Sequence, residues 1–148
     1  MLALKERLEP PRGHFLMKVY RRGLLVDEMD KRNLIVVGSQ LAHAKLLGGS
    51  VTNQSVTTIG YGTSGTTPVF GNTSITSPFT KALDSVTYPA SNQVQFNFSL
   101  ATTEDNGVAI MEFGLLNGLG ALYARIVRSS ALNKASDISL SGSWTISF

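Results

Sequence analysis

Apolar and polar residues alternate without interruption in two stretches of the chain, and this alternation indicates β-strands with one buried face. Residues 93–100 read QVQFNFSL, and residues 138–148 read ISLSGSWTISF. Successive side chains of a strand point to opposite sides, so each stretch offers one apolar side to a core. Further segments rich in β-branched or apolar residues lie at 55–62, 108–116 and 121–127. The second half of the chain is therefore predicted to be a series of strands joined by turns.

The sequence before residue 14 predicts an extended arm. Pro10 and Pro11 lack the backbone N–H that a helix interior or a central strand needs, so residues 1–13 are not expected to join either. Apolar-rich runs on both sides of an Arg-Arg-Gly turn then predict a hairpin over residues 14–30. Charged residues precede any apolar run, so no secretory leader is expected, and synthesis in the cytoplasm is the simpler interpretation.

A single helix is predicted over residues 36–47. Val37, Leu41 and Ala44 recur at helical spacing, and two glycines follow as a stop signal. This spacing is the evidence for the helix, and Leu47 extends it by one further step.

Short strands with turns about every 8–12 residues predict a mainly β fold. The expected architecture is an antiparallel β-sandwich, jelly-roll-like, with one short α-helix and an extended N-terminal arm. A single domain would span residues 14–148, and its β-rich body would span 50–148. The chain has no cysteine, so a disulfide or a thiolate metal site is excluded, and stability must come from a packed core, from oligomerisation, or from both.

Charged residues are concentrated at the start of the chain. Residues 1–32 hold eight basic and five acidic side chains, whereas no charged residue lies between Leu46 and Thr80. A long uncharged stretch suits exposed β-structure packed against neighbouring subunits. A nucleic-acid groove would need clustered Lys and Arg, so no direct nucleic-acid partner is expected. No apolar run reaches the roughly 18 residues of a membrane span, so membrane insertion is not expected either.

A literal G-x-G-x-x-G occurs at residues 60–65, but its context does not fit nucleotide binding. A dinucleotide fingerprint needs a helix at its last glycine and an acidic residue about 20 positions further on. Residues 66–71 read TTPVFG, which has no helical period, and the first acidic residue after the motif is Asp84. We interpret residues 60–70 as an uncharged contact or display loop.

Other candidate chemistry is equally weak. His14 and His43 lie in different predicted elements and have too few partners for a metal site, so His43 is expected at the surface or an interface. Glu104 and Asp105 are neighbours in a turn, which does not support a paired-carboxylate site. No nucleophile motif is present. We therefore expect no enzymatic activity, no cofactor and no metal.

Glu112 interrupts an apolar run, AIMEFG, and has two interpretations. Simple alternation would turn its side chain outward. The alternative is an ion pair across the sheet with Arg125 or Arg128, which stabilises neighbouring strands mildly.

Several phrases of the chain follow one another in a recognisable order. They are KRNLIVVGSQLAHAKLLGG, VTTIGYGTSGTTPVFGNTSI, FTKALDSVTYPASNQVQFNFSL, EDNGVAIMEFGLLNGLGALYARIVR and ALNKASDISLSGSWTISF. This series, over roughly residues 31–148, resembles a group of small virion proteins of tailed bacteriophages, described as tail-fibre, baseplate or minor structural proteins. The resemblance implies a non-enzymatic structural role in the virion. It also implies association with copies of itself and with other virion proteins of the tail, baseplate, collar or capsid.

The expected docking surface combines the arm, the hairpin and the glycine loop. Two alternatives stay open: a decoration (cement) protein on the phage head, and a carbohydrate-binding module that uses exposed aromatic side chains on the host surface. The candidate contact residues are Arg12, Lys18, Arg21, Arg22, Tyr61 and Phe70.

Overall fold

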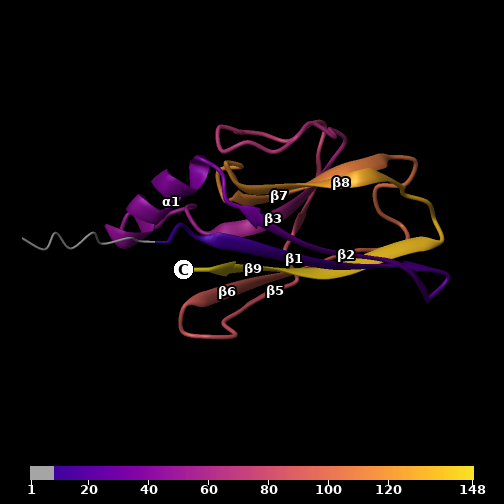
Figure 1. The fold of residues 1–148 in the computed structure, drawn as a ribbon, viewed down its shortest axis with the longest axis horizontal. Coiled ribbons are helices and arrows are strands. Elements are labelled where there is room, and N and C mark those ends of the chain that lie inside the picture. Colours follow the sequence, from indigo (N-terminus) through magenta and orange to yellow (C-terminus); the bar gives the residue numbers. More distant parts are fainter. Residues whose placement is uncertain (1–8) are drawn as a thin grey trace, which may run out of the picture.

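The computed structural model describes residues 9–148. Two antiparallel sheets pack face to face with one short helix at one end, which confirms the predicted antiparallel β-sandwich (Figure 1). Within the described residues, no helix is long and apolar enough to cross a membrane. The elements are β1 (Arg12–Arg21), β2 (Leu24–Leu34), α1 (Gly38–Leu47), β3 (Val56–Gly62), β4 (Phe79–Ala82), β5 (Ser85–Thr87), β6 (Gln93–Leu100), β7 (Ala109–Asn117), β8 (Leu122–Asn133) and β9 (Ile138–Ser147).

The strand order places β9 at the centre of the larger sheet. Sheet A runs β2-β1-β9-β6-β5, and sheet B runs β4-β3-β7-β8. Trp144 of β9 therefore lies between Phe15 of β1 and Phe96 of β6. Strands that are far apart in sequence thus meet at the middle of sheet A.

The core between the sheets is aromatic. The ring of Phe15 contacts the rings of Trp144, Phe113 and Phe98 at centroid distances of 5.0, 4.9 and 5.3 Å. Phe98 and Leu100 are buried as the alternation in residues 93–100 predicts. Each fully buried large side chain contributes about 1.5–3 kcal/mol relative to its exposed state, so this cluster is the main source of stability.

The N-terminal strand begins earlier than expected. Arg12 and Gly13 were expected in the arm, but they belong to β1 and pair with β9. Arg22 and Gly23 form the hairpin turn with φ of 51° and 78°, the left-handed values that a two-residue hairpin turn requires. Residues 1–8 of the predicted arm lie outside the described residues.

The helix is present, but the apolar residues at helical spacing are not the ones it buries. Leu41 is 61% exposed, and the buried residues of α1 are Ser39 and Ala42. A Cβ on Gly38 would collide with the backbone oxygen of Leu122, so the first turn of α1 lies directly against β8. Because the helix and β8 approach so closely, small residues form the side of α1 that contacts β8. The spacing of apolar residues does not determine which side that is.

The end of β2 closes one side of the sandwich. Ile35 forms a bridge with Ala124, and the backbone N–H of Val36 donates to the carbonyl of Tyr123 at 3.1 Å. Lys31 Nζ also donates to the carbonyl of Val127 at 3.0 Å. The chain therefore passes from sheet A to sheet B along β8.

Gly142→Ala is expected to lower the free energy of unfolding by about 2–3 kcal/mol. A Cβ at this position of β9 would lie 2.6 Å from Cζ of Phe98 and closer still to the backbone oxygen of Leu16. Urea denaturation measures the loss. Gly71→Ala is the matched control, because nothing lies within 4 Å of its Cβ position, and it should change stability by less than about 0.5 kcal/mol. Equal effects would contradict the close approach at Gly142.

Candidate functional site

A buried ion pair lies on the face of sheet B that points away from sheet A. Nε of Arg125 donates to Oε2 of Glu112 at 2.7 Å, and the two side chains are 3% and 0% exposed. Glu112 therefore pairs across the sheet with Arg125, which confirms the second of its two interpretations. The alternation itself holds, because the neighbouring Phe113 faces the core. The other candidate partner, Arg128, instead binds Asp27 at 3.0 Å.

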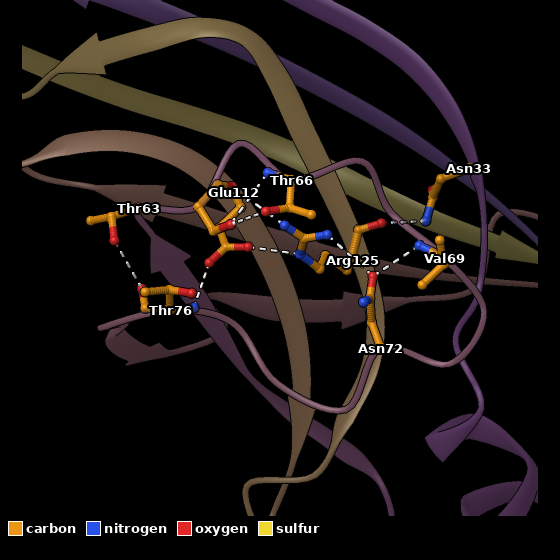
Figure 2. Close-up of polar contacts among 9 residues, drawn as sticks. Asn33, Thr63, Thr66, Val69, Asn72, Thr76, Glu112 and Arg125 are labelled. Carbon is orange, nitrogen blue, oxygen red and sulfur yellow. Dashed lines mark hydrogen bonds and ion pairs between the residues drawn. The ribbon is translucent and has the colours of Figure 1, made fainter.

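The loop that contains the glycine motif covers this ion pair (Figure 2). The backbone N–H of Thr76 donates to Oε1 of Glu112. Arg125 donates through Nη1 to Oδ1 of Asn72 at 3.1 Å and through Nη2 to the carbonyl of Ser64 at 3.3 Å. Each buried charge is thus met by several hydrogen bonds, which a buried ion pair requires.

The glycines of the motif let the loop lie flat on the sheet. A Cβ on Gly60 would lie 2.6 Å from Cδ1 of Ile75, and a Cβ on Gly62 would lie 2.5 Å from Oε1 of Glu112. Ile75 belongs to a second, smaller apolar cluster on this outer face. The cluster consists of Val36, Ile75, Leu116 and Leu122. The G-x-G spacing therefore has a packing role here.

The basic candidate contact residues lie at the surface of sheet A and its hairpin. Arg12 pairs with Glu9 near the start of β1. Arg21 and Arg22 lie 2.9 and 3.7 Å from a carboxylate oxygen of Asp137, which ties the hairpin turn to the connection between β8 and β9. Lys18 is exposed in the middle of β1. The four side chains therefore do not form one cluster.

The two aromatic candidates have opposite environments. Phe70 is 53% exposed in the loop, so it is available to a partner. Tyr61 is fully buried in the core, and its hydroxyl donates to the carbonyl of Ser99 at 2.9 Å. Burial also raises the pKa of Tyr61 well above its usual value. Its expected role at a surface contact is therefore wrong, because β3 turns the ring inward at a position where the sequence pattern indicated a loop.

The acidic turn after β6 is held in place by two lysines. Glu104 accepts a hydrogen bond from Lys81 at 2.8 Å, and this contact lowers the pKa of Glu104. Lys134 is buried and donates to Oδ1 of Asn106 at 2.8 Å. Burial raises the pKa of the adjacent Asp105, although the charge of Lys134 opposes this effect. The turn is thus held through contacts of Glu104 with Lys81 and of Asn106 with Lys134.

An open cavity of about 670 Å³ lies at the end of the sandwich next to α1, and the name end cavity is used for it below. Its volume falls in the range of about 300–1,000 Å³ typical of ligand pockets. Its lining is mainly apolar and contains no Lys, Arg, Asp or Glu. The principal apolar lining residues are Leu46, Val86, Tyr88, Phe96, Tyr123 and Phe148.

Two polar side chains of the end cavity differ in their hydrogen bonding. Nε2 of His43 lies 2.6 Å from the hydroxyl of Tyr123, so these two groups satisfy each other. Gln54 is 9% exposed and makes no side-chain hydrogen bond within residues 9–148, but its carboxamide reaches solvent, because the buried side-chain atom without a partner in this part of the chain is Oδ2 of Asp105. Sequence reasoning missed this cavity because its lining comes from separate elements that meet only in the folded chain.

The comparisons with known proteins find no match. No family model, no curated protein and no solved structure matches the chain. Within residues 9–148, no group of three or more His, Asp or Glu side chains lies close enough together to hold a metal ion.

Glu112→Gln is expected to lower the free energy of unfolding by about 3 kcal/mol, because the Arg125 guanidinium stays buried without its counter-charge. Chemical denaturation measures this loss, and the double variant Glu112→Met/Arg125→Met should recover much of it. Glu104→Gln is the matched control, since its pair with Lys81 is partly exposed and should cost less than about 1 kcal/mol. A loss for Glu112→Gln no larger than the control would contradict a charge-dependent core contact.

Stability is expected to fall as the pH drops below about 6.5, with a contribution from His43. Burial lowers the pKa of His43 in the folded chain, so the unfolded chain binds the proton more readily. The stabilisation is therefore present above the unfolded pKa and is lost as the pH falls through the folded one. Denaturation of the protein and of His43→Gln between about pH 7.5 and 5 measures the difference. Identical pH slopes for the two proteins would rule out the His43 contribution.

Proposed function

We propose that this chain is a non-enzymatic structural component of a tailed-phage virion, assembling at the tail, baseplate or collar through contacts with copies of itself and with other virion proteins. The proposal rests on the series of sequence phrases that resembles small virion proteins, and on one surface of the molecule that suits protein contact.

That surface is formed by Leu24, Leu25 and Val26 at the start of β2, directly after the Arg22–Gly23 turn, and it is called the hairpin tip below. These side chains are 72%, 49% and 55% exposed. The hairpin tip lies at the end of the molecule opposite α1 (Figure 1). Contiguous exposed apolar side chains are typical of interaction sites, and this patch is the observation that carries the proposal.

The hairpin is also held in a fixed direction, which favours docking. Arg21 and Arg22 both approach Asp137, so the turn is tied to the β8–β9 connection. A preorganised element loses less conformational entropy when it binds. The docking element in this proposal is therefore the ordered hairpin, together with the N-terminal arm.

The carbohydrate-binding alternative has less support. It needs aromatic rings displayed together, and Tyr61 lies in the core, which leaves Phe70 as the exposed member of the expected pair. Phe70 alone in its loop is a poor platform for stacking on a sugar, and the other exposed rings, Tyr88 and Phe148, lie apart from it at the end cavity.

The expected result is that the chain co-purifies with intact phage particles at a fixed stoichiometry through a density gradient, with density for it at the tail, baseplate or collar in an electron-microscopic reconstruction. Leu24→Glu should reduce incorporation, since it places a charge on the contact patch. Leu119→Glu, at a 65% exposed position in the β7–β8 turn outside the expected docking surface, should not. Absence from purified particles would refute the proposal. Density on the head lattice would instead assign the decoration role.

A further inference from the structure

Lys134, directly after β8, carries a buried amine whose position the backbone fixes. The residue is 2% exposed. The backbone N–H of Lys134 donates to the carbonyl of Val108, and the carbonyl of Lys134 accepts from the backbone N–H of Gly107, both at 2.9 Å. These two bonds hold Lys134 against the residues between β6 and β7, so its side chain starts from a fixed point beside that turn.

The shortest contact of this amine is with the side chain of Asn106. Nζ donates to Oδ1 of Asn106 at 2.8 Å, and to the carbonyls of Ala135 and Thr102 at 3.2 and 3.5 Å. Because a C=O bond is about 1.23 Å long, Nζ lies no more than about 4 Å from Cγ of Asn106. Reacting atoms have to lie about 3–3.5 Å apart, so the amine is already close to the distance at which it can attack this carbon.

A carboxyl group with an unused oxygen precedes Asn106 in the chain. Within residues 9–148, Oδ2 of Asp105 is the buried side-chain atom without a hydrogen-bond partner. The charges of Asp105 and Lys134 also act on each other, so the two groups lie in one electrostatic environment. Buried polar atoms are hydrogen-bonded in most proteins, and a free carboxyl oxygen beside an amine is therefore suited to exchanging a proton.

Burial shifts both groups toward their neutral forms. It lowers the pKa of Lys134, although the charges of Asp105, Glu104 and Asp137 oppose this effect. It raises the pKa of Asp105 against the charge of Lys134. Glu104 pairs with Lys81 and Asp137 pairs with two arginines, so these two carboxylates have partners elsewhere. A neutral amine is the nucleophilic form of lysine, and a neutral carboxyl can donate a proton.

We propose that Lys134 and Asn106 join through an isopeptide bond in the folded chain, with Asp105 as the proton carrier. The amine of Lys134 attacks Cγ of Asn106, the Nζ–Cγ bond forms, the Cγ–Nδ2 bond breaks, and ammonia leaves. Asp105 takes a proton from Nζ and passes it to Nδ2, so it ends in the state in which it began. The reaction requires no oxidant and no cofactor. Asn106 is exposed, so the ammonia leaves directly into water.

The bond closes a covalent loop around the β7–β8 hairpin. Asn106 and Lys134 are 28 positions apart, and both strands of the hairpin lie between them. The chain has no cysteine, so a disulfide cannot provide such a cross-link. A closed loop restricts the unfolded chain and thereby favours the folded one. This inference concerns a single chain and does not depend on the proposed assembly role.

Mass spectrometry of the intact chain is the first test. The chain should be lighter than its sequence by one ammonia, and proteolysis should release a branched peptide that joins the segments around Asn106 and Lys134. Lys134→Met should keep the full mass of its sequence. Lys81→Met is the matched control, because it removes the other lysine of this turn, which contacts Glu104 and not Asn106, and it should still lose ammonia. Circular dichroism checks folding, and the wild-type branched peptide decides the matter if Lys134→Met does not fold.

The sequence Asn106-Gly107 offers a second route to the loss of ammonia, which the same experiment separates. Attack by the backbone nitrogen of Gly107 on Cγ of Asn106 gives a cyclic succinimide of equal mass, confined to one linear peptide. Ammonia loss that persists in Lys134→Met, or that lies in a linear peptide, overturns the inference. A wild type of full sequence mass overturns it too, as does a loss of water with the branch at Asp105.

Asp105→Asn tests the proton carrier. Asparagine tolerates the left-handed backbone of this position, where φ is 54°, as aspartate does, but it cannot carry the proton. Chains recovered unfolded from inclusion bodies are refolded, and their mass is followed with time. Bond formation should slow by about a hundredfold or more in this variant, and Asp105→Glu should restore part of the rate. Glu104→Gln is the matched control and should keep most of it. An unchanged rate in Asp105→Asn refutes the role of Asp105.

Discussion

The structure depends on covering one buried ion pair outside its main core. Glu112 and Arg125 lie on the outer face of sheet B, where a sandwich normally meets water. Two charges withdrawn from water are tolerated only when every remaining donor and acceptor is satisfied. The chain meets this need with Asn72 and with backbone groups of Ser64 and Thr76. The residues after β3 must therefore fold back over the sheet, and their course is set by this pair.

The composition of the covering loop follows from the same constraint. The pair is already neutral, so the loop has to supply dipoles and no further charge, which accounts for part of the uncharged stretch between Leu46 and Thr80. Glycine at positions 60 and 62 removes the side chains that would hold the loop away from β3. Ile75 then packs in the space above Gly60. The glycines that resemble a nucleotide-binding loop are thus explained by close packing of the loop against sheet B.

The sequence predicted those parts of the fold in which local pattern and tertiary packing agree. Alternation in residues 93–100 and 138–148 identified strands and their inward faces, because burial on one side imposes a period of two. The sequence pattern does not identify the buried side of a helix when a contact with another element sets the helix orientation. The helix that contains Leu41 is an example, because the close approach of Gly38 to Leu122 orients it. The position of Tyr61 and the end cavity were not predictable for a related reason. Both depend on how two sheets and a helix meet, and no single segment carries that information.

The central position of β9 has a consequence for the order of folding. Sheet A is continuous only when β9 has paired with β1 on one side and with β6 on the other. During synthesis the β1–β2 hairpin can form first, but the aromatic neighbours of Phe15 are Phe98, Phe113 and Trp144. The first of these emerges more than eighty residues after Phe15. Pairing over such sequence separations is slow, because the chain loses conformational entropy on closing the loop before the stabilising contacts form. The nascent chain therefore exposes an aromatic surface for most of its synthesis. Chaperones or early assembly partners that bind this surface would act during that period.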